Sequence, residues 1–187
     1  MGIIKTIEPR LISQFRGPYW FLSNFYPLPI VINDITYRTS EHAYQAAKFL
    51  KDTGERNSVM NIFEPGKAKR EADRIVAKFL RPEAGDEDRE AVLTPDWDKR
   101  KVAIMNTVLR VKFAPGSDMA ELLMKTGTTP LLEGNWWHDN DWGSCEPRFR
   151  PRERSITCKP ECAEAGKNHL GKLLMHIRED LIREEME

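Results

Sequence analysis

The sequence is poor in cysteine, has no net charge and contains no long apolar run. Three of its 187 residues are cysteine, and 29 Lys and Arg residues balance 29 Asp and Glu residues. This balance excludes a surface built throughout for nucleic acid, although a local basic patch stays open. No apolar run approaches the length of a membrane span, so we expect no membrane contact. Because the N-terminus has no signal-peptide pattern, we expect a cytoplasmic protein with reduced cysteines, either free or bound to a metal.

What the chain does contain predicts an α+β fold. Its length and its 40% hydrophobic content favour one compact domain over residues 1–187, with several helices around a small β-sheet. Apolar residues alternate on either side of Asn33 and Asp34, which predicts a hairpin over residues 30–37. Strands come early and helices follow, without a regular βαβ rhythm.

Helical spacing and capping residues set the expected boundaries of the later elements. Thr39 or Ser40 can cap a helix that begins near Glu41, and Ser117 can cap another that reaches Leu123. Apolar residues recur at helical spacing in three further segments. We therefore expect helices over residues 68–79, 97–113 and about 170–184, a charged loop over residues 85–90, and a short buried strand over residues 131–133.

Residues 41–48 divide at 3.6 residues per turn into a polar face and a small apolar face. The polar face carries a carboxylate, a phenol, an amide and an amine, on Glu41, Tyr44, Gln45 and Lys48. Small side chains on the opposite face would let the helix pack closely against a core. A surface helix with its polar side in water is the plainer interpretation of this pattern. The sequence by itself leaves both interpretations open.

Aromatic residues gather in three segments far apart in the sequence. Residues 15–26 carry six aromatic side chains, which either stack on a base or fill the core. Trp97 precedes the basic run at residues 99–101, a pattern that suits a phosphate or base as well as a solvated helix start. Residues 136–143 hold three tryptophans, a histidine and two aspartates. A carboxylate between aromatic walls is suited to stabilise a sugar cation.

Five motifs appear in an order that resembles the NADAR, or YbiA-like, family, and they extend from about Phe15 to Arg178. They are Tyr19-x-Phe-Leu-Ser-Asn-Phe-Tyr26, Glu41-His-Ala-Tyr-Gln-Ala-Ala-Lys48, Asp96-Trp97 with Met105 and Lys112-Phe113, Asp139-x-x-Trp142-Gly143, and Gly166-x-Asn168-x-Leu170-Gly171-x-x-Leu174-Met175.

This resemblance implies an α+β fold and an N-glycosidase or ADP-ribosyl-glycohydrolase activity that needs no cofactor for catalysis. The implied substrates are phosphorylated riboflavin-pathway intermediates and ADP-ribose attached to guanine in DNA or RNA. The implied catalytic residues are Glu41, Lys48 and Asp139. The residues expected to bind the substrate are Tyr19, Phe21, Asn24, Gln45, Trp97, Trp142 and Asn168.

Each expected catalytic residue has a chemical role that fits the cleavage of a ribose-to-base bond. Glu41 is expected to act as general acid or base. Lys48 either attacks the anomeric carbon to form a Schiff base or orients Glu41 and a phosphate. Asp139 is expected to stabilise positive charge or to position water. The rival interpretation is a non-catalytic module that binds ADP-ribose or modified nucleic acid.

The chain departs from the family pattern in a Cys- and Arg-rich insertion at about residues 144–165. This insertion holds all three cysteines and a series of arginines, which would offer a local phosphate-binding patch. Cys158 and Cys162 have a spacing that zinc ligands can adopt, and Cys145 and His138 could complete the site. Reduced, unligated thiols are the alternative to a structural zinc ion.

Overall fold

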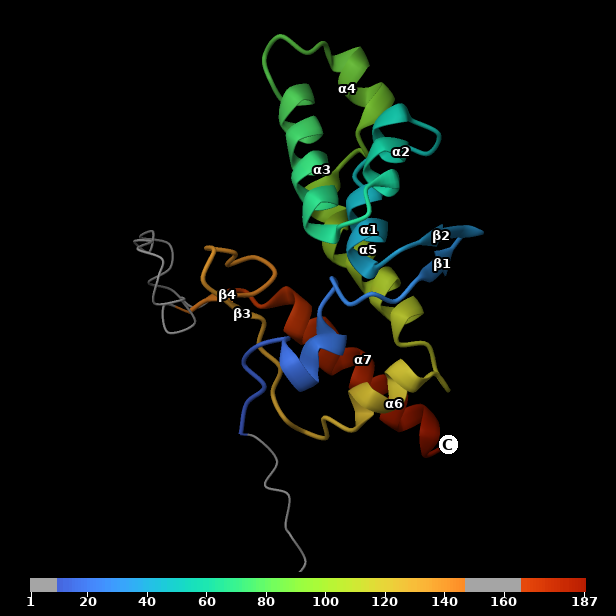
Figure 1. The fold of residues 1–187 in the computed structure, drawn as a ribbon, viewed down its shortest axis with the longest axis vertical. Helices are drawn as coiled ribbons and strands as arrows, with labels where there is room; N and C mark the ends of the chain where they lie inside the picture. The colour runs from blue at the N-terminus through green and yellow to red at the C-terminus, as the bar shows by residue number, and fades with distance from the viewer. Residues whose placement is uncertain (1–9, 147–165) are drawn as a thin grey trace, which may run out of the picture. The chain divides into compact units, whose positions relative to one another are not determined.

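The structure, a computed structural model, describes residues 10–146 and 166–187 as helices joined to two short strand pairs. This arrangement confirms the predicted α+β class. No helix in these ranges is long and apolar enough to cross a membrane. The elements are η1 (Gly17–Leu22), β1 (Ile30–Ile32), β2 (Ile35–Tyr37), α1 (Ser40–Ala46), α2 (Gly54–Asn61), α3 (Pro65–Phe79), α4 (Asp86–Val92), α5 (Trp97–Lys112), α6 (Asp118–Met124), β3 (Gly134–Asn135), β4 (Ser144–Cys145) and α7 (His169–Glu185) (Figure 1).

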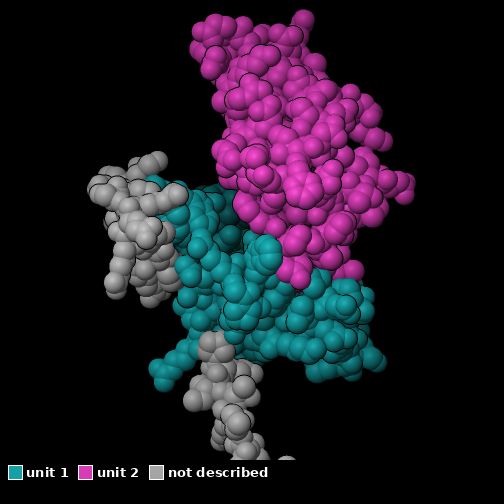
Figure 2. Space-filling view, in the orientation of Figure 1, with its two compact units in different colours: residues 1–23, 115–187 teal, residues 24–114 magenta. Residues whose placement is uncertain are grey.

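The chain divides into two compact units, which Figure 2 shows in different colours. The central unit comprises residues 24–114, and the terminal unit comprises residues 1–23 together with residues 115–187. The expected single domain over residues 1–187 therefore stays a prediction.

The central unit begins with the predicted hairpin. β1 and β2 pair antiparallel, with Ile30 opposite Tyr37. Asn33 and Asp34 form the turn with φ angles of 50° and 62°, as a two-residue hairpin turn requires. Thr39 then caps α1, because its side chain accepts a hydrogen bond from the backbone N–H of His42. The hairpin and the cap confirm what the sequence indicated for this segment.

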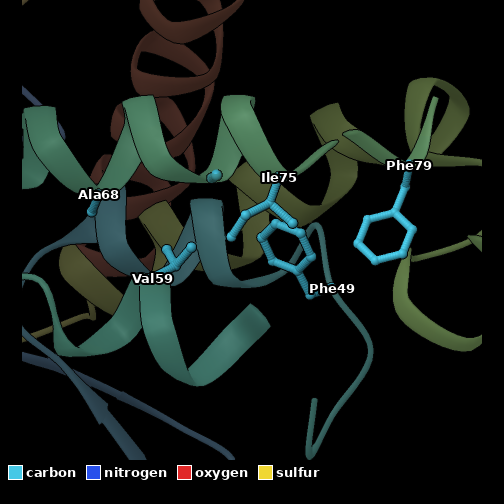
Figure 3. Packing of buried hydrophobic residues seen from close by; sticks show 6 residues of the cluster. Phe49, Val59, Ala68, Ile75 and Phe79 are labelled. Carbon is cyan, nitrogen blue, oxygen red and sulfur yellow. The ribbon is translucent and has the colours of Figure 1, made fainter. Parts of the chain in front are cut away.

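α2 and α3 enclose a hydrophobic cluster in the central unit. Ala68, Ile75 and Phe79 of α3 lie over Val59 of α2 and the Phe49 ring (Figure 3). α3 follows the predicted spacing, whereas the sequence did not indicate α2. This cluster gives α1 a firm support, because α1 contacts both helices.

α1 is the most enclosed element of the central unit, since all seven of its residues are buried. It ends at Ala46, so Lys48 lies just beyond the helix. Segment 47–50 leaves the helix to pair with segment 92–94: the amide of Leu50 donates to Val92 O at 2.8 Å, and the amide of Thr94 donates to Lys48 O at 2.9 Å. The interpretation of α1 as a water-facing surface helix is therefore wrong.

In the terminal unit, α6 packs against α7 and η1. Ser117 caps α6 as predicted, by accepting from the amide of Ala120. Arg178 of α7 is buried, and its guanidinium donates to Thr126 Oγ1 at 2.7 Å and to Thr129 O at 2.9 Å. This family-motif arginine thus fastens the chain after α6 to α7.

Two sequence expectations are wrong. Residues 85–90, expected as a loop, begin the helix α4, because three acidic side chains at its start interact favourably with the helix dipole. The expected strand over residues 131–133 is reduced to a single bridge between Leu131 and Ile12, and the named strand β3 begins only at Gly134.

Candidate functional site

Glu41 places a carboxyl group inside the central unit, in the first turn of α1. Its backbone N–H donates to Asn24 O at 3.0 Å, and its side chain accepts from Gln45 Nε2 at 2.7 Å. The residue is only 6% exposed. Burial raises the pKa of Glu41 above its ordinary value of 4.5, while the bond from Gln45 opposes this shift. Such a group can hold or release a proton nearer to neutral pH.

Two amide side chains beside Glu41 keep an acceptor without a protein donor. Gln45 is 1% exposed and Asn24 is 7% exposed. In the described part of the chain no donor reaches Gln45 Oε1 or Asn24 Oδ1. The other end of the Asn24 amide lies 3.4 Å from Met105 Sδ, a weak acceptor. A buried acceptor left in this way costs about 1–3 kcal/mol.

Lys48 carries its amine to a carboxylate of α3. Its Nζ lies 2.6 Å from Asp73 Oδ1, and Lys69 Nζ lies 3.1 Å from Asp73 Oδ2. Burial lowers the pKa of Lys48, and the contact with Asp73 opposes that shift. The positive charges of Lys69 and Lys48 in turn counter the effect of burial on the pKa of Glu41. Glu41 and Lys48 therefore influence each other electrostatically.

Trp97 starts α5 and packs at a tilt against Tyr44 on the polar face of α1. Its ring centroid lies 5.2 Å from that of Tyr44, with the two planes 49° apart. The structure thus brings Trp97, Glu41, Gln45 and Asn24 to one helix of the central unit. The prediction that they bind substrate stays a prediction.

A cavity of about 530 Å³ lies on the opposite, alanine side of α1. Ala43 and Ala47 belong to its lining, as do Arg56 and Arg100, but Glu41 and Lys48 do not. Arg56 is held there by donating to Ala46 O at 3.1 Å and to the Tyr37 hydroxyl. The alanine face therefore meets the core through Ala43 and Ala46, and borders the cavity through Ala43 and Ala47.

Asp139 lies in the terminal unit, where its carboxylate organises a loop. Asp139 Oδ1 accepts from the amides of Asp141 and Trp142, at 3.1 and 2.9 Å. The Asn135 side chain bonds both the N–H and the C=O of Asp139. These contacts give Asp139 a structural task, and its predicted catalytic role remains a prediction.

Asn168 also bonds the backbone through both ends of its amide. Its Oδ1 accepts from the amide of Glu133 at 3.1 Å, and its Nδ2 donates to Leu131 O at 2.9 Å. Gly171 lets the chain approach there, since a Cβ atom would lie 2.3 Å from Leu131 O. The last motif of the family therefore fastens the start of α7 to segment 131–133. The predicted binding role of Asn168 is an additional task that stays untested.

The aromatic residues of the terminal unit differ in exposure. Phe21 of η1 is buried, and Tyr19 is half-buried. The half-buried Trp142 meets His169 edge-on, with ring centroids 6.0 Å apart. Phe21 therefore acts at least as a core residue, which was one of the two interpretations of its cluster.

The expected zinc ligands are described only in part. His138 Nδ1 lies 3.5 Å from Cys145 Sγ, so these two expected ligands are neighbours. Cys158 and Cys162, with the arginine-rich part of the insertion, fall outside the described residues. Within residues 10–146 and 166–187, no three His, Cys, Asp or Glu side chains gather as a metal site. Two of the four expected ligands are thus adjacent, and zinc remains a prediction.

The sequence interpretation missed Asp73 and Lys69, the α3 partners of Lys48. Both lie on the polar side of α3, four residues apart, as for an ordinary surface ion pair. The sequence carried no signal that Lys48, 25 residues away from Asp73, would join them.

The central unit of this α+β fold thus holds a buried carboxyl group with a raised pKa, and a lysine paired with a carboxylate. The chain belongs to the NADAR domain family, whose model matches residues 12–182. The match extends over both units and confirms the resemblance found in the sequence.

Relatives of the chain carry N-glycosidase names. It is 33% identical to the N-glycosidase Npun_R5314 of Nostoc punctiforme, over 88% of this chain and 86% of the relative. It is 30% identical to the N-glycosidase YbiA of Escherichia coli, over 89% and 84%. The NMR structure of E. coli YbiA matches 99% of this chain and 93% of its own, with a TM-score of 0.69 and 28% identity. A riboflavin biosynthesis protein of Vibrio vulnificus, VVA0006, is 29% identical over 86% of this chain and 35% of its own length.

Proposed function

We propose that this chain is an N-glycosidase that hydrolyses the bond between a ribose anomeric carbon and a base nitrogen. The buried Glu41 carboxyl group, with its raised pKa, carries the proposal. Cleavage of such a bond needs a proton donor for the departing base or a base that activates water. The names of the relatives from Nostoc punctiforme and Escherichia coli support the same reaction class.

Glu41 is suited to this proton transfer because its position is fixed. The Asn24 carbonyl holds its backbone, and the Gln45 amide holds one carboxyl oxygen. In its protonated form Glu41 would donate to the leaving nitrogen, and in its ionised form it would accept a proton from the attacking water. Trp97, packed at a tilt against Tyr44, offers an aromatic surface for the base or the sugar.

A ribosyl substrate also matches the two amide oxygens beside Glu41. Gln45 Oε1 and Asn24 Oδ1 are buried acceptors, and ribose hydroxyl groups are donors. We propose as substrates either ADP-ribose linked to guanine in nucleic acid or a phosphorylated nucleoside-like intermediate. The name of the Vibrio vulnificus relative favours the second class.

The roles of Lys48 and Asp139 are open to a direct test. If Lys48 attacks the anomeric carbon, borohydride added during turnover should leave a sugar adduct on Lys48, detectable by peptide mass spectrometry. If Lys48→Ala is inactive and borohydride leaves no adduct on the parent protein, the results would instead favour a role for the charge of Lys48. Asp139→Asn keeps an acceptor for the loop amides, so a loss of turnover in a stable variant would indicate chemistry at Asp139.

The decisive experiment compares the two substrate classes. The protein is incubated with an oligonucleotide carrying ADP-ribosylated guanine and with phosphorylated ribosylamino pyrimidines, with Glu41→Ala as the blank. Release of base and sugar by the parent alone supports the proposal and selects the substrate. Retention of an intact ligand without release would favour the rival binding module and contradict the enzyme proposal.

A further inference from the structure

Lys48 is held from another helix by Asp73 of α3. The lysine side chain is 11% exposed, whereas that of Asp73 is 50% exposed, and the ion pair is 2.6 Å long. The amine therefore lies mostly out of water, whereas its carboxylate partner is half exposed. Lys48 follows the end of α1, so that helix does not set the direction of its side chain. Asp73 supplies that constraint.

The same carboxylate serves two amines. Its Oδ1 meets Lys48, and its Oδ2 meets Lys69 at 3.1 Å, one turn earlier on α3. Partial burial raises the pKa of Asp73, but the bonds and charges of Lys48 and Lys69 together outweigh it and lower the pKa. With Glu41, the groups that act on Lys48 are therefore two acids and one further amine.

We propose that Asp73 is a positioning residue that keeps Lys48 as a directed ammonium ion, so that Lys48 contributes fixed positive charge and not a nucleophilic amine. The inference rests on the proposed N-glycosidase function. An amine must lose its proton before it can attack carbon, and a carboxylate at 2.6 Å favours the protonated form. A fixed cation is suited to bind a substrate phosphate. Its charge also lowers the pKa of Glu41.

Two substitutions of Asp73 separate charge from shape. Asp73→Asn keeps the size of the side chain and removes its charge, so that only the charge of Glu41 still opposes the effect of burial on the pKa of Lys48. Asp73→Glu restores the charge. Glu71→Gln is the matched control, because Glu71 lies on the same helix and bonds Arg74 at 2.7 Å. Lys48 titration is followed by NMR of ¹³Cε-labelled lysine, with Lys48→Met identifying the signal, and kcat is measured against pH.

The expected result is a joint shift. In Asp73→Asn the Lys48 titration and the alkaline limb of kcat both move to lower pH, with a loss of about tenfold in kcat near pH ~9 and a smaller change near neutrality. Asp73→Glu returns both toward the parent, and Glu71→Gln changes neither. Borohydride traps no adduct on Lys48 in the parent.

Three outcomes would overturn the inference: an unchanged Lys48 titration in Asp73→Asn, a shifted titration with an unmoved alkaline limb, or a trapped adduct. Failure of the proposed function is recognised separately. If the parent cleaves no N-ribosyl substrate, the role in catalysis is lost, while the NMR titration still decides whether Asp73 controls the charge of Lys48.

Discussion

The polar residues around α1 of the central unit differ from those at the start of α7 of the terminal unit. Gln45 and Asn24, beside Glu41, each keep a buried acceptor that no donor of residues 10–146 and 166–187 reaches. Asn168, by contrast, uses both ends of its amide for backbone bonds, and Asp139 accepts two loop amides. Both sets belong to the motifs that identify the family.

This difference teaches that membership in a family motif does not by itself assign chemistry. A buried polar group that the fold leaves without a partner lowers stability, so the fold alone does not account for it. A fully bonded polar group is already explained by the fold. The central unit therefore holds the stronger candidates for catalysis, and substitutions in each unit should fail in different ways.

Glu41→Gln should have the largest effect on turnover, a loss of about 10²–10⁴-fold in kcat. The same change should raise stability at neutral pH. Because the pKa of Glu41 is raised by folding, its contribution is present below pH 4.5 and is lost as the pH rises through the folded value. Thermal unfolding at two pH values measures this. A variant both inactive and less stable at neutral pH would break the comparison.

Asn168→Ala should reduce the stability of the protein more than its affinity for substrate. Two side-chain bonds to the backbone disappear, and alanine tolerates the left-handed φ of 51° poorly, so we expect a loss of about 2–4 kcal/mol. Asn168→Gly accepts that φ and should lose less. Denaturant unfolding, with KM measured on the folded fraction, distinguishes the cases. Normal stability with a raised KM would make Asn168 a binding residue.

His42→Gln tests a fully bonded residue next to Glu41. His42 Nε2 lies 3.0 Å from the Ile62 carbonyl, which can only accept, so Nε2 carries a proton. Burial lowers the pKa of His42 below 6.5, so the parent should lose stability as the pH falls below 6.5. The loss is at most about 1.4 kcal/mol per pH unit.

The pH dependence of His42→Gln should be weaker over the same range, as measured by denaturant unfolding at several pH values. If the free energy of unfolding depends on pH equally in parent and variant, His42 is not the source of the pH dependence.

Lys69→Gln should have the smallest effect on stability, about 0.3–0.5 kcal/mol, because its ion pair with Asp73 is exposed. Lys125→Gln in the terminal unit removes a similar pair with Glu121 at 3.2 Å. Only Lys69→Gln should also move the acidic limb of kcat to higher pH, because Lys69 lowers the pKa of Glu41. Identical pH profiles for both variants would remove the electrostatic distinction between the two units.

Local signals made much of the fold predictable. The Asn33–Asp34 turn and the caps Thr39 and Ser117 depend on neighbouring residues, and the structure has all of them. The site was predictable only as a set of residue types. The burial of Glu41, the end of α1 before Lys48 and the contact of Lys48 with Asp73 all depend on helices that pack from elsewhere in the chain.

The pairing of segment 47–50 with segment 92–94 limits what the octapeptide at residues 41–48 can carry on its own. Phe49 faces Leu93 in a backbone bridge, and the Thr94 amide bonds the carbonyl of Lys48 itself. A graft of the octapeptide onto another helix would therefore transfer Glu41 and Gln45 but not the direction of the lysine. The transferable unit is the octapeptide together with segment 92–94 before α5 and Asp73 of α3.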